Sequence, residues 1–572
     1  MVGKKGSNTS SNSSIAAPSA AGLAQLDNAG LSWFHIRTVL VAGMGFFCDS
    51  YDLFVISLIT KCIGRLYYPD IAYYSPERCA DNHISNITTA CSHKYASLIS
   101  SGISPADATY HVPSAMPANV DAALKGVALC GTLAGQLIFG YLGDRFGRRV
   151  SFGATLVVMV VAALLQGLSF GNTANGVIAS LCLFRFALGV GVGGDYPLSA
   201  TLMSEYSSRS NRGKLVGAVF AMQGIGILAA ATVTIIFAAI FQNQNQNADS
   251  MWRLILMFGA VPTAATMYAR LNLPETPRYT LLVKQNAATA ASDIAQVLGT
   301  AAPAHESVKP VVKKMSLRML IKNYGWKLFG CSMCWFLLDI AFYSQNLFQS
   351  DVFSAIGWIP KAQTMTITEE VFKTARAQAL IALFSTVPGY WVTVFTVEKL
   401  GRWWIQLGGF TIMTLCMAIL AGDYDNLKAN NVTAFVALYA LCFFFANFGP
   451  NSTTFILPAE LFPAQYRSTA HGIAAASGKA GAIIGAFGFA AANTAIGLRP
   501  TLAILAAINF AGLLFTFLVP ETKGRTLEEI TEELAHIPET TTSTPMTGSS
   551  SDLTIEMTAV DDTLSRPETD QA

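Results

Sequence analysis

The chain has 572 residues, of which 52% are hydrophobic and only 13% are charged. Soluble domains usually carry about 25% charged residues, so this composition argues against a string of soluble domains. The net charge of +2 gives no electrostatic basis for binding nucleic acid. The composition therefore predicts an integral membrane protein without a nucleic-acid partner.

The apolar residues fall into long runs that contain few charges. About 20 apolar residues cross a bilayer as a helix, and a helix satisfies its own backbone hydrogen bonds in lipid. A transmembrane barrel would instead show alternating segments of about ten residues, a pattern that we do not find. We therefore expect an all-α membrane protein. Its spans are expected at 37–59, 121–142, 150–170, 177–203, 214–241, 252–270, 328–350, 375–396, 403–421, 433–457, 468–490 and 500–519.

The segments outside these spans differ in composition. Residues 1–36 lack the apolar core of a signal peptide and predict a disordered cytoplasmic N-terminus. Residues 60–120 predict a long extracellular loop, in which a Cys79–Cys91 disulfide is possible. Residues 271–327 are basic and predict a cytoplasmic central loop, and residues 520–572 predict a cytoplasmic tail that is disordered from about 536. Two sequons on the expected outer side give the glycosylation candidates, Asn86 and Asn431.

The chain repeats itself at an interval of roughly 250 residues. Gly143-Asp144-Arg145-Phe146-Gly147-Arg148-Arg149 is echoed by Glu398-Lys399-Leu400-Gly401-Arg402, and Pro274-Glu275-Thr276 is echoed by Pro520-Glu521-Thr522. A third echo links Ser204-Glu205 with Ala459-Glu460. The echoes predict two six-helix halves, at 37–270 and 328–519, and parallel halves of this kind place a substrate between them near the bilayer midplane.

The GDRFGRR loop and the Pro-Glu-Thr segments resemble those of the major facilitator superfamily, and the ending from Pro520 to Glu529 resembles its sugar-porter-like branch. The resemblance covers nearly all of residues 35–535. It implies the twelve-helix fold of that superfamily and alternating access. It also implies that the loop forms a cytoplasmic gate, with the charged residues Asp144, Arg145, Arg148 and Arg149.

Several ionisable residues lie inside the expected spans. They are Asp49, Asp52, Arg185, Asp195, Asp339 and Lys479. Each costs about 2.5–3.5 kcal/mol at mid-bilayer on insertion scales, so each requires a reason. Pairing that locks helices together is one reason. Four acids against two bases do not cancel by pairing, however, and an acid that takes up a proton suits a proton carrier.

Polar neighbours favour a small oxyanion as the substrate. Lys479 supplies a positive charge, and neutral donors are available from Tyr196, Gln223, Trp335, Tyr343 and Asn451. Monobasic phosphate has hydroxyl protons that a carboxylate accepts, whereas sulfate at neutral pH has none. An aspartate in the pocket therefore favours phosphate over sulfate.

The run from Gly193 to Glu205 (GGDYPLSATLMSE) resembles the fourth-span signature of fungal and plant phosphate:proton symporters. This resemblance implies that phosphate is bound by Asp195, Tyr196, Gln223, Trp335, Asp339, Tyr343, Asn451 and Lys479. It implies proton handling by Asp49 or Asp52 together with Asp195. The combination of Asp49 with Arg185 resembles the span-1 acid and span-4 arginine pair of related proton symporters.

The sequence thus predicts a proton-coupled phosphate importer, not an enzyme, with no metal and no cofactor. Expected partners are inorganic phosphate, protons and membrane lipid, for a monomeric unit in the plasma membrane with both termini in the cytoplasm. Two alternatives stay open: a sugar or other organic-solute:proton symporter of the same fold, and a non-transporting phosphate receptor that signals from the same pocket.

Overall fold

The computed structural model describes residues 18–68, 116–242, 248–299, 315–360 and 365–531. Within these ranges twelve helices or helix pairs are long and apolar enough to cross a membrane, which confirms the expected number. The predicted Cys79–Cys91 pair and the sequon at Asn86 lie outside the described residues. Asn431 is exposed, and its side chain accepts a hydrogen bond from the backbone N–H of Ala434, where it caps a helix.

The first six spans form one half, called here the N-half. They are α2 (Trp33–Tyr67), α5 (Ala118–Phe146), α6 (Arg148–Gly167), α7 (Ala174–Tyr206), α8 (Arg212–Phe241) and the pair α9 (Ala248–Met257) and α10 (Ala260–Leu271). Most of these helices extend a few residues beyond the runs expected from hydropathy. The sixth span breaks at Gly259, where an added Cβ would collide with the Asp52 carboxylate.

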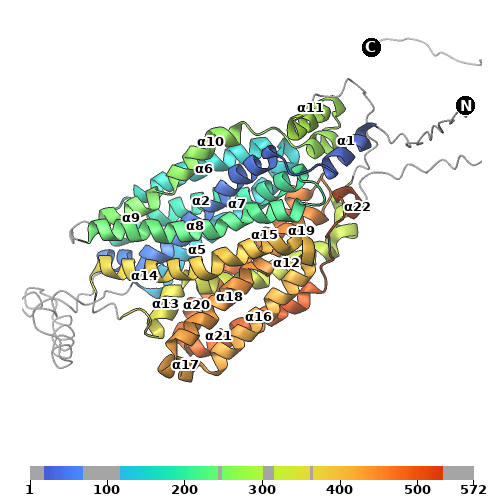
Figure 1. The fold of residues 1–572 in the computed structure, drawn as a ribbon. Helices are drawn as coiled ribbons and strands as arrows, with labels where there is room; N and C mark the ends of the chain where they lie inside the picture. Colours follow the sequence, from blue (N-terminus) through green and yellow to red (C-terminus); the bar gives the residue numbers. More distant parts are fainter. Residues whose placement is uncertain (1–17, 69–115, 243–247, 300–314, 361–364, 532–572) are drawn as a thin grey trace, which may run out of the picture. The chain divides into compact units, whose positions relative to one another are not determined.

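The second six spans, with the short α13, form the C-half. They are α12 (Leu317–Leu347), the joined α14 (Ile367–Ile381), η6 (Ala382–Thr386) and α15 (Val387–Leu400), α16 (Arg402–Gly422), α18 (Val432–Asn447) with α19 (Pro450–Leu461), α20 (Arg467–Ile496) and α21 (Leu498–Thr516). The short helices α13 (Gln349–Ala355) and α17 (Tyr424–Asn430) lie at one end of the bundle (Figure 1). We call this the α13 end.

Four short elements lie at the opposite end, called here the α1–α22 end (Figure 1). They are α1 (Pro18–Asp27), η4 (Tyr279–Val283), α11 (Ala287–Leu298) and α22 (Leu527–Thr531). The expectation of disorder over residues 1–36 is wrong for 18–27. Leu23 and Leu26 are buried, and Asp27 makes ion pairs that hold α1 in place.

The internal repeat has a physical basis in the turns between spans. Gly147 joins α5 to α6 with φ of 109°, and Gly401 joins α15 to α16 with φ of 94°. Only glycine adopts such angles readily. An added Cβ would meet Glu275 at the first turn and Glu521 at the second, so the loop echo and the Pro-Glu-Thr echo build the same corner in both halves.

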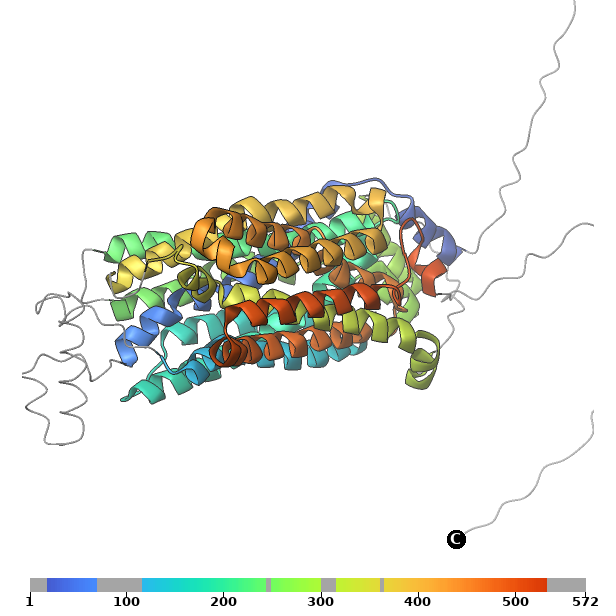
Figure 2. The same cartoon turned by 90° about the horizontal axis from the view of Figure 1, so that it is seen from below.

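Close helix packing inside the N-half depends on small residues. Figure 2 shows the long helices running side by side. Where α5 meets α7, a Cβ at Gly135 would strike the backbone carbonyl of Val190, and one at Gly193 would strike that of Thr132. Small residues allow helix backbones to approach in this way inside membranes. The two halves meet mainly where α5 contacts α20 and where α8 contacts α14 and α15.

Replacing Gly135 by alanine should destabilise the fold, because the new Cβ pushes against a backbone carbonyl that cannot turn away. Overpacking of this kind typically costs about 1–3 kcal/mol. The measurement is the thermal loss of the monodisperse peak in detergent. Gly488→Ala is the matched control, because nothing lies within 4 Å of its Cβ position. Equal melting temperatures for the two variants would contradict this packing.

Candidate functional site

A buried ion pair lies between α12 and α20. Lys479 Nζ is 2.8 Å from Asp339 Oδ2, and each of the two residues is 1% exposed. Both side chains therefore point into the protein and toward each other, as the sequence predicted, and not toward lipid. A pair buried in this way loses its hydration, and is stable only while each charge keeps a partner.

Aromatic side chains from both halves surround this pair. Lys479 Nζ lies 4.5 Å from the ring centre of Tyr343, and 5.0 Å from that of Tyr196 on α7. The Tyr196 and Trp335 rings are 6.5 Å apart. The lysine of the C-half thus touches a tyrosine of the N-half, which places the pair at the boundary between the halves.

The predicted amides lie at the same boundary. The Asn451 amide donates to Tyr390 Oη at 2.7 Å and to Asn447 Oδ1 at 2.8 Å. Gln223 on α8 is buried, and its Oε1 has no hydrogen-bond partner. Sequence reasoning missed Tyr390, because a tyrosine in an apolar run has no signal that separates it from ordinary packing.

Aromatic contacts between the halves lie along the bundle on each side of the ion pair. Toward the α13 end, Tyr343 stacks on Phe54 of α2 with ring centres 5.6 Å apart. Toward the α1–α22 end, Phe220 of α8 stacks on Phe455 of α19 at 4.4 Å. The Lys479–Asp339 pair is therefore enclosed between two aromatic layers.

Asp195 does not join this group, although it was expected to contact the substrate. Its carboxylate accepts hydrogen bonds from both terminal nitrogens of Arg270 on α10, one at 3.0 Å, and from Thr155 Oγ1 at 2.8 Å. Neighbouring residues on a helix point about 100° apart, so Asp195 faces α6 and α10 while Tyr196 faces Lys479. Gly45 leaves the space for this pair, since a Cβ there would collide with both partners.

The two acids of α2 lie near different arginines and form no ion pair with them: Asp49 lies near Arg270, and Asp52 lies near Arg185. All four carboxylate oxygens of Asp49 and Asp52 are buried without a hydrogen-bond partner. The expected Asp49–Arg185 pair is not formed. Arg185 donates instead to the backbone carbonyls of Leu124 and Asp52 and to Gln166 Oε1. Among the described residues, no cluster of His, Cys, Asp and Glu side chains is arranged to hold a metal ion.

At the α1–α22 end, the halves are joined by a buried glutamate. Glu205 Oε1 on α7 is 3.0 Å from Arg148 Nη2 of its own half and 2.9 Å from Arg467 Nη1 of the C-half. Arg148 also donates to the backbone carbonyl of Ala464 in the C-half, at 2.7 Å. Glu205 lies in the segment that is echoed by Ala459-Glu460, yet a repeat alone does not indicate which charges meet across the boundary.

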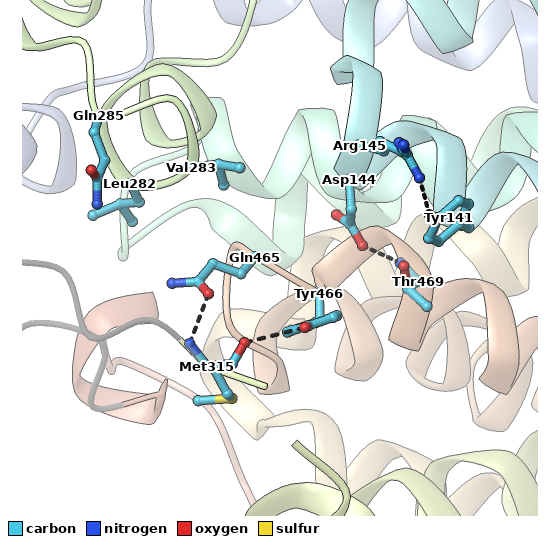
Figure 3. A pocket seen from close by; sticks show the side chains of 10 residues that line it. All are labelled: Tyr141, Asp144, Arg145, Leu282, Val283, Gln285, Met315, Gln465, Tyr466 and Thr469. Carbon is cyan, nitrogen blue, oxygen red and sulfur yellow. Dashed lines mark hydrogen bonds between the residues drawn. The ribbon is translucent and has the colours of Figure 1, made fainter. Parts of the chain in front are cut away.

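The predicted gate residues divide into two pairs. Asp144 accepts hydrogen bonds from the backbone N–H groups of Ser468 and Thr469 at the start of α20, and together with Arg148 it joins the halves. Figure 3 shows this contact between Asp144 and Thr469, which both line a pocket of about 450 Å³. Arg145 instead bonds the Tyr141 hydroxyl beside it, and Arg149 bonds the Leu271 carbonyl of its own half.

A second set of ion pairs ties α1 and α22 to the same end. Asp27 Oδ1 lies 3.2 Å from Arg212 Nη2 and 2.7 Å from Arg278 Nη2, and Arg278 Nε lies 2.8 Å from Glu528 Oε1. Burial alone would raise the pKa of Glu528, but the Arg278 guanidinium outweighs it and lowers the pKa to about 2. The Glu528 carboxylate therefore stays charged at physiological pH, and its pair with Arg278 helps to close this end.

Two helical halves, with a buried charged pair at their boundary and breakable ion pairs at an end, define a membrane carrier. The profile of the family described as "Sugar (and other) transporter" matches residues 38–534. The chain belongs to this family of transporters and is not an enzyme.

Curated relatives include inorganic phosphate transporter 1-2 of Oryza sativa subsp. japonica. That protein is 49% identical over 89% of this chain and 96% of its own length. Low affinity inorganic phosphate transporter 1 of Petunia hybrida is 49% identical over 89% of this chain and 95% of its own length. Among solved structures, the proton:xylose symporter XylE bound to 6-bromo-6-deoxy-D-glucose aligns with a TM-score of 0.62. It is 19% identical and covers 87% of this chain and 98% of its own, which confirms the major facilitator fold.

Replacing Glu205 by glutamine should open the α1–α22 end, because two buried arginines from opposite halves would lose their shared counter-charge. Breaking a buried ion pair by removing one partner costs about 3–5 kcal/mol. The measurement is the distance between spin labels at the exposed positions Ser210 and Lys523, expected to lengthen.

Glu460→Gln is the matched control, because the Glu460 carboxylate accepts hydrogen bonds from Arg402 and Thr522, which both follow α12 in the chain and belong with the C-half. That variant should keep the labels at their original distance. A Glu205→Gln distance distribution identical to that of the control would show that Glu205 does not hold the end closed.

Proposed function

We propose that the chain imports inorganic phosphate with protons by alternating access, with phosphate bound between the halves near the bilayer midplane. The observation that carries this proposal is the buried Lys479–Asp339 pair at the boundary of the two halves, at 2.8 Å. The names of the curated relatives support phosphate as the substrate. The proposed setting is the plasma membrane, with the α1–α22 end in the cytoplasm and one chain as the functional unit.

Phosphate suits a site that contains both a cation and a carboxylate. The Lys479 ammonium attracts the anion, while the Asp339 carboxylate accepts a hydrogen bond from a hydroxyl group of monobasic phosphate. A sulfate ion has no such proton and would set two negative groups against each other in a medium that screens them poorly. A sugar needs neither a buried lysine nor a buried aspartate, so the same pair argues against the sugar alternative.

Neutral donors and acceptors complete the proposed site. Tyr196 and Gln223 would bind the anion from the N-half. From the C-half the proposed ligands are Trp335, Asp339, Tyr343, Asn451 and Lys479. Because both halves would contact the same ion, binding of that ion favours the form in which the two halves lie close together around it. Alternating access requires such a closed form between the outward-open and inward-open states. Because Asp195 is held by Arg270 and faces away, it leaves the phosphate set and remains in the proton set.

The proposed proton site consists of Asp49, Asp52 and Asp195 with their neighbouring cations. Asp49 and Asp52 have no hydrogen-bond partner, and Asp195 is paired with Arg270. A proton taken up by one of these carboxylates changes the affinity of the other two for a proton. Arg270 is the cation within bonding distance of an acid here. Arg185 donates a hydrogen bond to the backbone carbonyl of Asp52.

Uptake of radioactive phosphate into proteoliposomes under an imposed pH gradient tests the function, with xylose, sulfate and arsenate as competitors. Lys479→Ala should raise the KM for phosphate about ten- to a hundredfold, because a charge-assisted hydrogen bond contributes about 1.5–3 kcal/mol. Asp339→Asn should also impair uptake. Lys428→Ala, on the short helix α17, is the control.

Three outcomes separate the alternatives. Uptake of radioactive xylose without uptake of phosphate would indicate a sugar symporter, and phosphate binding without uptake would indicate a receptor. An unchanged KM in Lys479→Ala would contradict the site assignment.

Asp49→Asn should uncouple phosphate from protons, because an amide at this unpaired, buried position cannot carry the proton. Phosphate exchange between the two sides should persist, while uptake should stop responding to an inward pH gradient. Asp425→Asn is the control, since Asp425 pairs with the exposed Arg499 at the α13 end. Full dependence on the gradient in Asp49→Asn would remove this residue from the proton site.

A further inference from the structure

A second charged cavity lies at the α13 end, apart from the central ion pair. It has a volume of about 610 Å³, and it is lined by ionisable side chains from both halves. Its charged lining residues are Lys61, Arg65, Asp121, Lys125, Asp351 and Glu370. No role could be predicted for these residues from the sequence, since all of them lie near expected span ends, where charges are common.

Three ion pairs cross this cavity from one half to the other. Lys61 Nζ is 3.4 Å from Asp351 Oδ1, and Lys125 Nζ is 3.7 Å from Asp351 Oδ2. Arg65 Nη1 is 3.0 Å from Glu370 Oε2. Lys125 also pairs with Asp121 of its own helix at 2.7 Å. The α13 end is therefore held closed by charges.

These charges are sorted by half. The cations Lys61, Arg65 and Lys125 all belong to α2 and α5 of the N-half, with the single acid Asp121. The acids Asp351 and Glu370 belong to α13 and α14 of the C-half. When the halves separate at this end, the N-half wall retains a net charge of +2, and the C-half wall carries −2.

The exposed N-half wall would then need a new anion. Lys125 is only 2% exposed and lies 4.1 Å above the Phe348 ring, so its ammonium has little access to water in the closed form. Arg65 is likewise largely buried and donates through two nitrogens to the Met365 carbonyl as well. A tetrahedral oxyanion offers several acceptors at once and can replace the departing carboxylates.

We propose that Lys61, Arg65 and Lys125 form an entrance site for phosphate on the outward-open carrier, with Asp351 and Glu370 taking the place of the anion when the end closes. This inference rests on the proposed function, which sets the direction of import. The carboxylates imitate the substrate and displace it inward toward Lys479 as the halves approach. A local positive wall also raises the rate at which anions reach the carrier.

The test separates an entrance site from a simple latch in an Asp351→Asn background, in which the two inter-half ion pairs of Lys61 and Lys125 are already absent and the Arg65–Glu370 pair remains. In Asp351→Asn the partner of Lys61 and Lys125 is neutral, so further loss of either cation no longer breaks an inter-half pair. Adding Lys125→Gln to this background should raise the KM for phosphate uptake roughly three- to tenfold at low salt, with little change in Vmax. Potassium chloride should shrink the difference, because salt screens the wall.

Lys373→Gln in the same background is the matched control, since Lys373 pairs with Glu369 one turn away and is not among the residues that line the cavity. Because Lys125 is buried, Lys61→Gln serves as a second variant whose side chain is partly exposed. The uptake of a variant is compared only if the purified variant elutes as a monodisperse peak in detergent, which shows that it is folded.

An unchanged KM in both double variants, with Vmax alone altered, would overturn the entrance site and leave a latch. That result leaves the proposed function intact. Absence of saturable phosphate uptake by the unaltered chain would overturn the proposed function and this inference together.

Discussion

The Lys479–Asp339 pair is the constraint on which the rest of the structure depends. Two opposite charges 2.8 Å apart in a dry interior hold α12 against α20. The pair is stable only because it is complete, since losing one partner strands the other in low dielectric. A ligand can enter such a site only if it carries charges that substitute for the partner it displaces. Phosphate offers a negative oxygen to the lysine and a hydroxyl group that can donate a hydrogen bond to the aspartate, so it can replace the partner of each residue. Aromatic stacks lie on either side of the pair, and a medium of low dielectric between them would strengthen the proposed exchange.

The contacts within a half and those between the halves differ in kind. Inside the N-half, glycines such as Gly135 and Gly193 bring backbones into contact, and no side-chain rotation can release such packing. Between the halves at the two ends, carboxylates of one half meet cations of the other: Glu205 with Arg467, and Asp351 with Lys125. Ion pairs can separate when water or another ion replaces the lost partner. The chain thus combines rigid halves with exchangeable end contacts, as rigid-body rocking requires.

Much of this could be predicted from sequence, and the failures have clear causes. The spans follow from hydropathy because lipid tolerates few charges. Lys479 and Asp339 could be selected from the sequence because charges inside a span are costly, but their direct contact with each other is seen only in the structure. The direction of Asp195 could not be derived, because its rotation about α7 depends on Arg270, a residue placed at the edge of an expected span. Arg185 matched a family pattern, yet it bonds backbone carbonyls instead of Asp49. Helix α1 was missed because two buried leucines and one aspartate leave no periodic signal in a polar segment.

Adjacent residues of α7 connect the two proposed sites. Tyr196 faces Lys479, and Asp195 faces Arg270 with the unpaired Asp49 and Asp52 nearby. A proton taken up near Asp195 weakens its bond to Arg270, because the carboxylate loses its charge. Any rotation or shift of α7 that follows must move Tyr196 relative to Lys479 as well, since the two side chains share one stretch of backbone. The same helix ends at Glu205, whose carboxylate bridges Arg148 and Arg467. Helix α7 therefore carries the proposed proton acid, a wall of the proposed phosphate site and the closing charge of the α1–α22 end, so a movement of this helix can reach all three.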